Sequence, residues 1–317
     1  MIGTMSPVLV QPAFAKINLA LGVAAPLPAG HPRAGFHEIA SWMAPLRLHD
    51  EVRVERCAAG ERAFAVEWAV DALRPTPIDW PHERDLAFRA WRLLESETGA
   101  AMDCRVTVRK RVPVGAGLGG GSSDAAACLL LLAHAFAPRT PRGRLRELGA
   151  TLGSDVPFFI DDGPVNAPPR SALVTGLGEG LERVPTAPAT VCLFMPPFGC
   201  PTGPVYRAFD ALAGRDPGKG AEASRVRRLA TASGALESRD LFNDLTAAAE
   251  VVAPGLAGLR RTVSSAVGAP VHLTGSGSCC FAVLPAGAEA SVGGRWVEAA
   301  RALGCAAVMT DLAVGAE

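Results

Sequence analysis

The sequence predicts a two-domain α+β protein. Its 317 residues are 49% hydrophobic and 20% charged, which is enough for real cores and is typical of a soluble enzyme. Strand-like and helix-like patterns are mixed in both halves of the chain. The polar, proline-rich stretch Asp161–Arg170 indicates a domain boundary between the two halves. We therefore expect one domain at residues 1–165 and a second at residues 166–317.

The first half opens with alternating apolar residues over Val8–Val23, which predict a strand or hairpin arm. The proline- and glycine-rich stretch Ala24–Gly35 predicts a loop, and His49-Asp50 predicts a turn between two strands. The remaining elements follow from a period of two or from helical spacing of apolar residues. We expect strands at Ile39–Leu48, Glu51–Arg56, Cys104–Val108 and Val156–Ile160, and helices at Asp85–Glu97, Ser122–Phe136 and Leu145–Thr151.

The second half mixes short apolar strands with amphipathic helices, as an α+β sandwich does. A second glycine turn, Thr274–Ser278, lies between two of the strands. We expect strands at Val191–Met195, Val271–Leu273, Cys280–Leu284 and Ala306–Met309, and helices at Val205–Leu212, Leu245–Val252, Ala257–Ser265 and Ala290–Ala302.

Charge and cysteine content exclude several classes of protein. The 31 basic residues balance 31 acidic ones, so the chain lacks the basic field that a nucleic-acid partner requires. We find no signal peptide and no apolar run of membrane-spanning length, and we expect no membrane partner. Eight cysteines without a C-x-x-C pair favour a reducing, cytoplasmic location. The sequence leaves the oligomeric state open.

The most informative segment is a glycine run directly before an apolar helix. Five glycines within residues 115–121 remove side chains where the backbone must approach a ligand or adopt positive φ. Ser122 and Ser123 then offer hydroxyls that could cap the helix, whose N-terminus attracts anions. The segment therefore predicts a phosphate-binding loop.

Two common phosphate motifs fit this segment poorly. Gly115-x-Gly117-x-x-Gly120 matches the dinucleotide fingerprint by letter, but the acidic residue expected about 20 positions later is missing. A Walker A loop would end in Gly-Lys-Ser/Thr, and this run does not. A flexible loop without a ligand remains the ordinary alternative, which the serines and helix that follow at once make less favourable.

Three segments together resemble the motifs of the GHMP kinases, in the right order along the chain. They are Ala13–Leu19, Pro113–Ala126 and Leu273–Phe281. The resemblance implies an N-terminal domain like domain 2 of ribosomal protein S5 and a ferredoxin-like C-terminal domain. It also implies ATP as phosphoryl donor and Mg²⁺ carried mainly by the nucleotide phosphates, so we assign no protein ligand to the metal. Asp124 either simply favours the dipole of its helix or holds a serine or a magnesium-bound water.

Four further features narrow the resemblance within the family. They are Lys16 with Asn18, Gly35–Ile39, Leu152–Phe159 and Phe242–Leu245. They are similar to the members that phosphorylate a cytidine diphosphate-linked polyol, a small molecule of isoprenoid precursor synthesis. Another small-molecule kinase, such as a homoserine kinase, and a catalytically silent nucleotide-binding regulator remain as alternatives.

The resemblance implies that Asp155 is the catalytic base and Lys16 its electrostatic partner. A lysine beside the aspartate would lower the pKa of its carboxyl group. From the residues alone, Asp155 is as well explained by a turn after Gly153-Ser154, and Lys16 by a solvated strand face. Asn18 shares a strand face with Lys16 because side chains alternate with a period of two.

The resemblance also assigns the ligand-binding residues. ATP is expected on Pro113, Val114, Gly115, Ala116, Gly117, Leu118, Gly119, Gly120, Gly121, Ser122 and Ser123, and the substrate on Asn18, Phe36, His37, Phe198, Thr202, Gly275 and Ser276. Phe36 stands where the family often has tyrosine, and it keeps a face that can stack on cytosine. The loops at residues 24–35 and 161–170 are longer than the family pattern.

Overall fold

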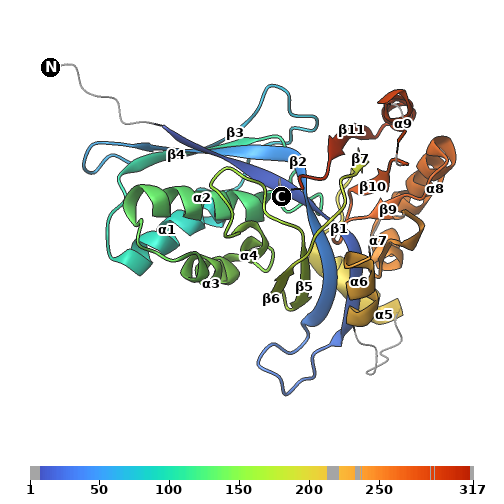
Figure 1. Ribbon diagram of the computed structural model, residues 1–317, viewed down its shortest axis with the longest axis horizontal. Coiled ribbons are helices and arrows are strands. Elements are labelled where there is room, and N and C mark those ends of the chain that lie inside the picture. The colour runs from blue at the N-terminus through green and yellow to red at the C-terminus, as the bar shows by residue number, and fades with distance from the viewer. Residues whose placement is uncertain are drawn as a thin grey trace. The chain divides into compact units, whose positions relative to one another are not determined.

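The computed structural model describes residues 8–212, 221–232, 236, 238–285, 287–288 and 290–314. The chain forms two compact units (Figure 1). The first unit comprises Met1–Ala15, Leu48–Val114 and Gly119–Pro169, and the second comprises Lys16–Arg47, Gly115–Leu118 and Arg170–Glu317. The long strands β1 (Leu9–Pro26) and β2 (His37–Arg56) contribute to both units. A linear division between residues 165 and 166 stays a prediction.

The first unit is a sheet covered by helices. The end of β2 pairs antiparallel with β4 (Cys104–Lys110), which pairs in parallel with β3 (Ala63–Trp68). Figure 1 shows the helices of this unit gathered on one side of these strands. The helices are η1 (His82–Arg84), α1 (Leu86–Thr98), α2 (Gly120–Phe136), α3 (Arg142–Leu152) and α4 (Val156–Phe159).

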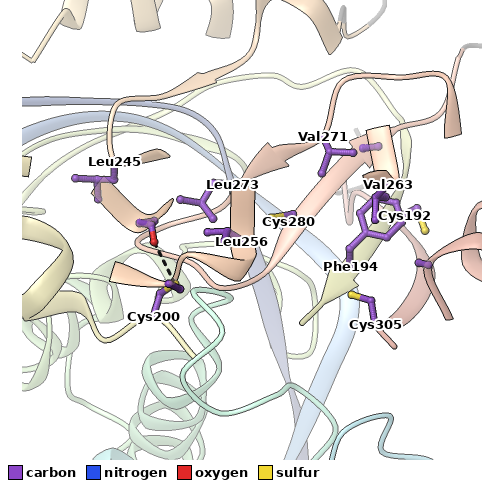
Figure 2. Packing of buried hydrophobic residues seen from close by; sticks show 14 of the residues in the cluster. Cys192, Phe194, Cys200, Leu245, Leu256, Val263, Val271, Leu273, Cys280 and Cys305 are labelled. Carbon is purple, nitrogen blue, oxygen red and sulfur yellow. Dashed lines mark hydrogen bonds between the residues drawn. The ribbon is translucent and has the colours of Figure 1, made fainter. Parts of the chain in front are cut away.

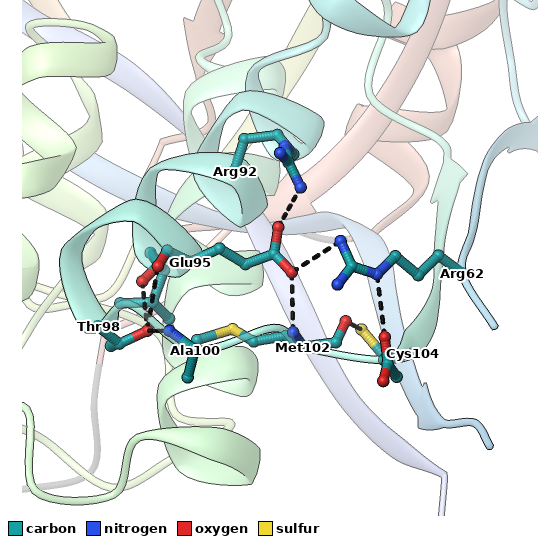
Figure 3. Close-up of polar contacts among 9 residues, drawn as sticks. Arg62, Arg92, Glu95, Thr98, Ala100, Met102 and Cys104 are labelled. Atoms are coloured by element: carbon teal, nitrogen blue, oxygen red, sulfur yellow. Dashed lines mark hydrogen bonds and ion pairs between the residues drawn. The ribbon is translucent and has the colours of Figure 1, made fainter. Parts of the chain in front are cut away.

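Helix α1 is fixed at both ends by its own sequence. Asp85 caps its start by accepting a hydrogen bond from the Ala87 N–H at 2.9 Å, and Gly99 ends it with φ +65°. Near the end of the helix, the buried Glu95 accepts from the Met102 N–H at 2.8 Å and pairs with Arg62 at 3.2 Å (Figure 3). These bonds tie α1 to the chain that enters β4.

The second unit contains two sheets. One has the strand order β6-β5-β2-β1-β8, in which β5 (Ala172–Gly176) and β6 (Gly180–Arg183) form a hairpin and β8 (Phe242–Asn243) pairs in parallel with β1. The other is antiparallel, with the order β11-β7-β10-β9. Its strands are β7 (Thr190–Met195), β9 (His272–Leu273), β10 (Cys280–Val283) and β11 (Ala306–Asp311). The helices are α5 (Thr202–Leu212), α6 (Ala223–Ala230), η2 (Ser238–Asp240), α7 (Thr246–Val252), α8 (Gly255–Val267) and α9 (Ala290–Ala302).

The core of the second unit is rich in cysteine (Figure 2). Cys192, Cys280 and Cys305 pack with Phe194 and Leu256, all at 3% exposure or less. Burial raises the pKa of Cys192 and of Cys280 to about 12, so these thiols stay neutral. All eight cysteines of the chain are free thiols. Most of them serve as small apolar groups, as their apolar surroundings in the sequence indicate.

Three predicted features are wrong. The two strands expected around His49-Asp50 are one continuous strand, β2, in which Asp50 is fully buried. The strand expected at Val156–Ile160 is the short helix α4, with proline in its first turn. Helix α2 begins at Gly120, and its cap is Gly119 at φ +71° rather than a serine hydroxyl. Strands β3, β5, β6 and β8 and helix α6 were not predicted. Within the described ranges, no helix is long and apolar enough to cross a membrane.

Candidate active site

The predicted phosphate loop contains the first turn of helix α2. Gly119 adopts a left-handed conformation, and its carbonyl accepts the Ser123 N–H at 2.9 Å. The first amides of an α-helix have no acceptor within the helix, and the helix dipole is positive at that end. The amides of Gly120, Gly121 and Ser122 are therefore available as backbone donors for an anion.

A buried cluster of charged side chains lies next to the start of helix α2. The Lys110 ammonium, at 4% exposure, contacts the carboxylates of Asp50 and Asp124. Asp50 also accepts the backbone N–H groups of Arg111 and of Val112, the latter at 2.7 Å. The cluster joins strand β2 and the end of β4 to Asp124, which directly follows the first turn of α2.

The pKa shifts of Lys110 and Asp124 follow from their burial and from the charges around them. Although burial opposes its charge, Asp124 and Asp50 raise the pKa of Lys110, which stays an ammonium. Burial raises the pKa of Asp124 well above its usual range, against the attraction of Lys110, and the like charge of Asp50 adds to the increase. Asp124 Oδ2 thus holds the lysine, while Asp124 Oδ1 is buried and has no hydrogen-bond partner among the described residues. Sequence analysis missed Lys110 and Asp50; the one signal for Lys110 in the sequence is that the chain has only three lysines.

The middle of the predicted loop, Gly115–Leu118, lies against the second glycine turn within the second unit. The Ala116 carbonyl accepts the Cys279 N–H at 3.2 Å, and the Leu118 carbonyl accepts the Lys16 N–H at 2.9 Å. A Cβ at Gly117 would come 2.5 Å from the Thr274 carbonyl oxygen, and the φ of Gly117 is +77°. Two glycine segments far apart in the sequence are therefore packed together, and only glycine fits at position 117.

Asn18 connects Lys16 to this second glycine turn. Both side chains are buried at 3% exposure, and the Lys16 ammonium donates to Asn18 Oδ1 at 2.7 Å. The same oxygen accepts the Gly275 N–H at 3.0 Å. Asn18 Nδ2 donates to Ser41 Oγ at 2.7 Å, and the Asn18 N–H donates to Thr274 Oγ1 at 3.0 Å. The structure thus brings together Lys16, Asn18 and Gly275, three residues that the sequence assigned to the site.

Asp155 lies in the first unit, directly before helix α4. It has helical φ and ψ and is partly exposed. Gly149 of the preceding helix leaves room for Val156, whose Cγ1 would lie 2.8 Å from a Cβ at that glycine. This packing fixes the start of α4 and hence the backbone of Asp155. The pairing of Asp155 with Lys16 stays a prediction.

Phe36 and His37 lie side by side but in different surroundings. Phe36 is 61% exposed, whereas His37 is buried at 8%. His37 Nδ1 lies 2.9 Å from the Ala24 carbonyl, its Nε2 lies 3.4 Å from Asp210 Oδ1, and its ring packs on Tyr206. The exposed ring of Phe36 has a face that a base could stack on. The role of His37 toward a cytosine stays a prediction.

The remaining predicted residues lie around the second glycine turn. Thr202 Oγ1 and Ser276 Oγ lie 2.9 Å apart, so two expected substrate-binding hydroxyls are neighbours. Ser278 Oγ donates to the Phe198 carbonyl at 2.6 Å. The Phe198 ring is half-buried and lies 3.3 Å from where a side chain at Gly255 would begin. Phe198 as a wall of a cytosine pocket stays a prediction.

A cavity of about 400 Å³ in the second unit is lined by Arg47, Thr190 and Asp311 among apolar residues, and none of the predicted site residues lines it. Across the described ranges, no group of three or more His, Cys, Asp or Glu residues could hold a metal ion.

Comparison with known proteins gives consistent matches. The family model "GHMP kinases N terminal domain" matches residues 85–163. Proteins named 4-diphosphocytidyl-2-C-methyl-D-erythritol kinase from Pelotomaculum thermopropionicum and Symbiobacterium thermophilum are 36% and 35% identical, and the matches cover 85% and 91% of this chain and 86% and 94% of theirs. A crystal structure of 4-(cytidine 5'-diphospho)-2C-methyl-D-erythritol kinase matches 98% of this chain and 100% of its own, with a TM-score of 0.72 and 30% identity. A homoserine kinase from Cytophaga hutchinsonii, at 14% identity and a TM-score of 0.59, shares the fold.

Proposed function

Because this chain belongs to the 4-diphosphocytidyl-2-C-methyl-D-erythritol kinase family of GHMP kinases, we propose that it transfers the γ-phosphate of ATP to the 2-hydroxyl of 4-diphosphocytidyl-2-C-methyl-D-erythritol. The family and the α+β GHMP kinase fold predicted from the sequence are confirmed. The observation that carries the substrate proposal is that relatives of this name match nearly the whole chain. The reaction belongs to isoprenoid precursor synthesis.

We propose that the triphosphate of ATP binds along Pro113–Ser123. The amides at the start of α2 and the positive end of its dipole would face the phosphate oxygens. Phosphoryl transfer depends mainly on positioning and on neutralising charge, so a rigid row of donors is the main requirement. The Lys110 cluster supports this proposal because it holds α2 at Asp124, directly after the first turn.

Asp155 is proposed as the base and Lys16 as its positively charged partner. Asp155 would accept the proton of the 2-hydroxyl while that oxygen bonds to the γ-phosphorus. The bond from the γ-phosphorus to the bridging oxygen breaks, and ADP leaves. The Lys16 ammonium, oriented by Asn18, would favour the ionised form of Asp155.

Magnesium is expected to arrive with the nucleotide. Mg²⁺ commonly keeps several waters and binds substrate phosphates with few protein carboxylates. The Lys110 ammonium contacts Asp124 Oδ2, so that oxygen is not available to the ion. When bound, the ion would neutralise charge on the transferring phosphate.

For the substrate, we propose that Phe36 and Phe198 stack on the cytosine and that His37 hydrogen-bonds its edge. Thr202, Ser276, Gly275 and Asn18 would face the polyol diphosphate. The exposed ring of Phe36 and the adjacent hydroxyls of Thr202 and Ser276 support this assignment. The free thiols of all eight cysteines support a cytoplasmic location.

The test is a coupled ADP-release assay with two acceptors, the cytidyl polyol and homoserine. We expect turnover with the cytidyl polyol, and ³¹P NMR should show one new phosphomonoester on its 2-hydroxyl. Turnover with homoserine alone would establish the nearest alternative. ATP binding without transfer to any acceptor would point to a silent regulator.

A further inference from the structure

The peptide groups of Gly275 are held from both sides by asparagine side chains. Its N–H donates to Asn18 Oδ1 at 3.0 Å, and its carbonyl accepts from Asn243 Nδ2 at 2.8 Å. The two asparagines come from neighbouring parallel strands, β1 and β8, in which Asn243 lies opposite Leu21. Two polar side chains of the same sheet therefore fix one residue of the second glycine turn.

Asn243 uses its whole amide group for this purpose. Its Nδ2 donates to the carbonyls of Leu273 at 3.0 Å and Gly275 at 2.8 Å, while its Oδ1 accepts the Leu245 N–H at 2.9 Å. The side chain is buried at 9% exposure. A side-chain amide supplies two donors and an acceptor, whereas a carboxylate would turn acceptors toward two carbonyl oxygens. Aspartate therefore cannot replace asparagine here without moving Gly275.

The contacts continue from Gly275 to Lys16. Asn18 Oδ1 accepts both the Gly275 N–H and the Lys16 ammonium, the latter at 2.7 Å. A Cβ at Gly275 would lie only 3.6 Å from Lys16 Nζ. A shift of Gly275 would change both the shared acceptor and the space beside the ammonium. Three hydrogen bonds, through Gly275 and Asn18, therefore connect Asn243 to Lys16.

We propose that Asn243 is a positioning residue for Lys16 and acts through the backbone of Gly275. Its effect on turnover rests on the proposed catalytic function of Lys16, but its effect on the position of the lysine does not. Because a misplacement of about 1 Å can cost about 100-fold in rate, loss of the Asn243 donors should lower kcat by about 10- to 100-fold. The KM for ATP should change much less.

The experiment uses the scarcity of lysine and asparagine in this chain. Lys16, Lys110 and Lys219 are its three lysines, and Asn18, Asn166 and Asn243 its three asparagines. In protein labelled with ¹³C-lysine, Lys16→Arg assigns the Lys16 Cε signal. Asn243→Asp should shift that signal and leave the Lys110 signal in place. Asn166→Asp, the same change at an exposed loop position, should shift neither.

Kinetics separate positioning from general damage to the fold. In a Lys16→Ala background, Asn243→Asp should lower the residual kcat by less than about 2-fold, since coupled residues are not additive. If Asn243→Asp lowers kcat by about 10- to 100-fold in the Lys16→Ala background as well, the proposal is overturned. An unshifted Lys16 signal in folded Asn243→Asp would also overturn it. If Asn243→Asp does not fold, Asn243→Ser, which keeps one donor, carries the same test.

The two proposals fail in different ways. An inactive wild-type enzyme with the cytidyl substrate would refute the proposed function, while the NMR shifts would still test the positioning of Lys16. If the wild-type enzyme is active, but neither the Lys16 signal nor the turnover changes in Asn243→Asp, only the positioning proposal is refuted.

Discussion

Replacing Gly117 by alanine should damage the protein more than the same change at Gly115, two residues earlier. Both glycines have positive φ, +68° at Gly115 and +77° at Gly117. A Cβ at Gly115 would meet nothing within 4 Å, whereas a Cβ at Gly117 would lie 2.5 Å from the Thr274 carbonyl oxygen and 3.2 Å from that of Gly277. The two variants therefore share the same backbone strain and differ in the clash.

The magnitudes follow from this difference. A left-handed alanine costs about 1–2 kcal/mol, which is the expected loss in the free energy of unfolding for Gly115→Ala. The clash at position 117 adds about 1–3 kcal/mol, because the obstacle is backbone that must move. Gly117→Ala should therefore lose about 2–5 kcal/mol.

Urea denaturation of both variants and of the wild type measures these losses at equilibrium. Equal losses for the two variants would refute the close packing of Gly117 on the second glycine turn.

Three further changes test separate parts of the account. Lys110→Met leaves two buried carboxyl groups without their cation and should lose about 3–5 kcal/mol in urea denaturation; a loss below about 1 kcal/mol would contradict the cluster. Burial lowers the pKa of His272 to about 4, so between pH 6.5 and 4 the unfolded chain binds the proton more strongly and stability falls as the pH falls. Between pH 6.5 and 4, the free energy of unfolding of His272→Gln should fall by about 3 kcal/mol less than that of the wild type. Identical pH profiles of unfolding for the two proteins would refute this prediction. Asp155→Asn and Lys16→Ala should each lower kcat by about 100- to 10,000-fold in the ADP-release assay, and near wild-type turnover in both would reject the proposed pair.

Local rules predicted much of the fold. The helix that starts near Asp85, the alternating strand around Lys16 and the glycines of the two turns all depend on neighbours in sequence. The continuous strand β2 was missed because His49-Asp50 has the composition of a turn. Its aspartate is instead satisfied by backbone amides about 60 residues later, at Arg111 and Val112. Such partners leave no local signal.

The same reasoning explains which site residues could be predicted. The period of two places Lys16 and Asn18 on one face, and the structure joins them by a hydrogen bond. Helix α4 was mistaken for a strand because four apolar residues fit either element. The Lys110 cluster and the contact of Asn243 with Gly275 join distant segments, so only the three-dimensional structure reveals them.

A crystal structure with a non-hydrolysable ATP analogue and the cytidyl polyol would test the central claim most directly. We predict the phosphates on the amides of Gly120, Gly121 and Ser122 and the substrate 2-hydroxyl within hydrogen-bond distance of Asp155. Nucleotide bound elsewhere, or a 2-hydroxyl that no carboxylate reaches, would contradict it.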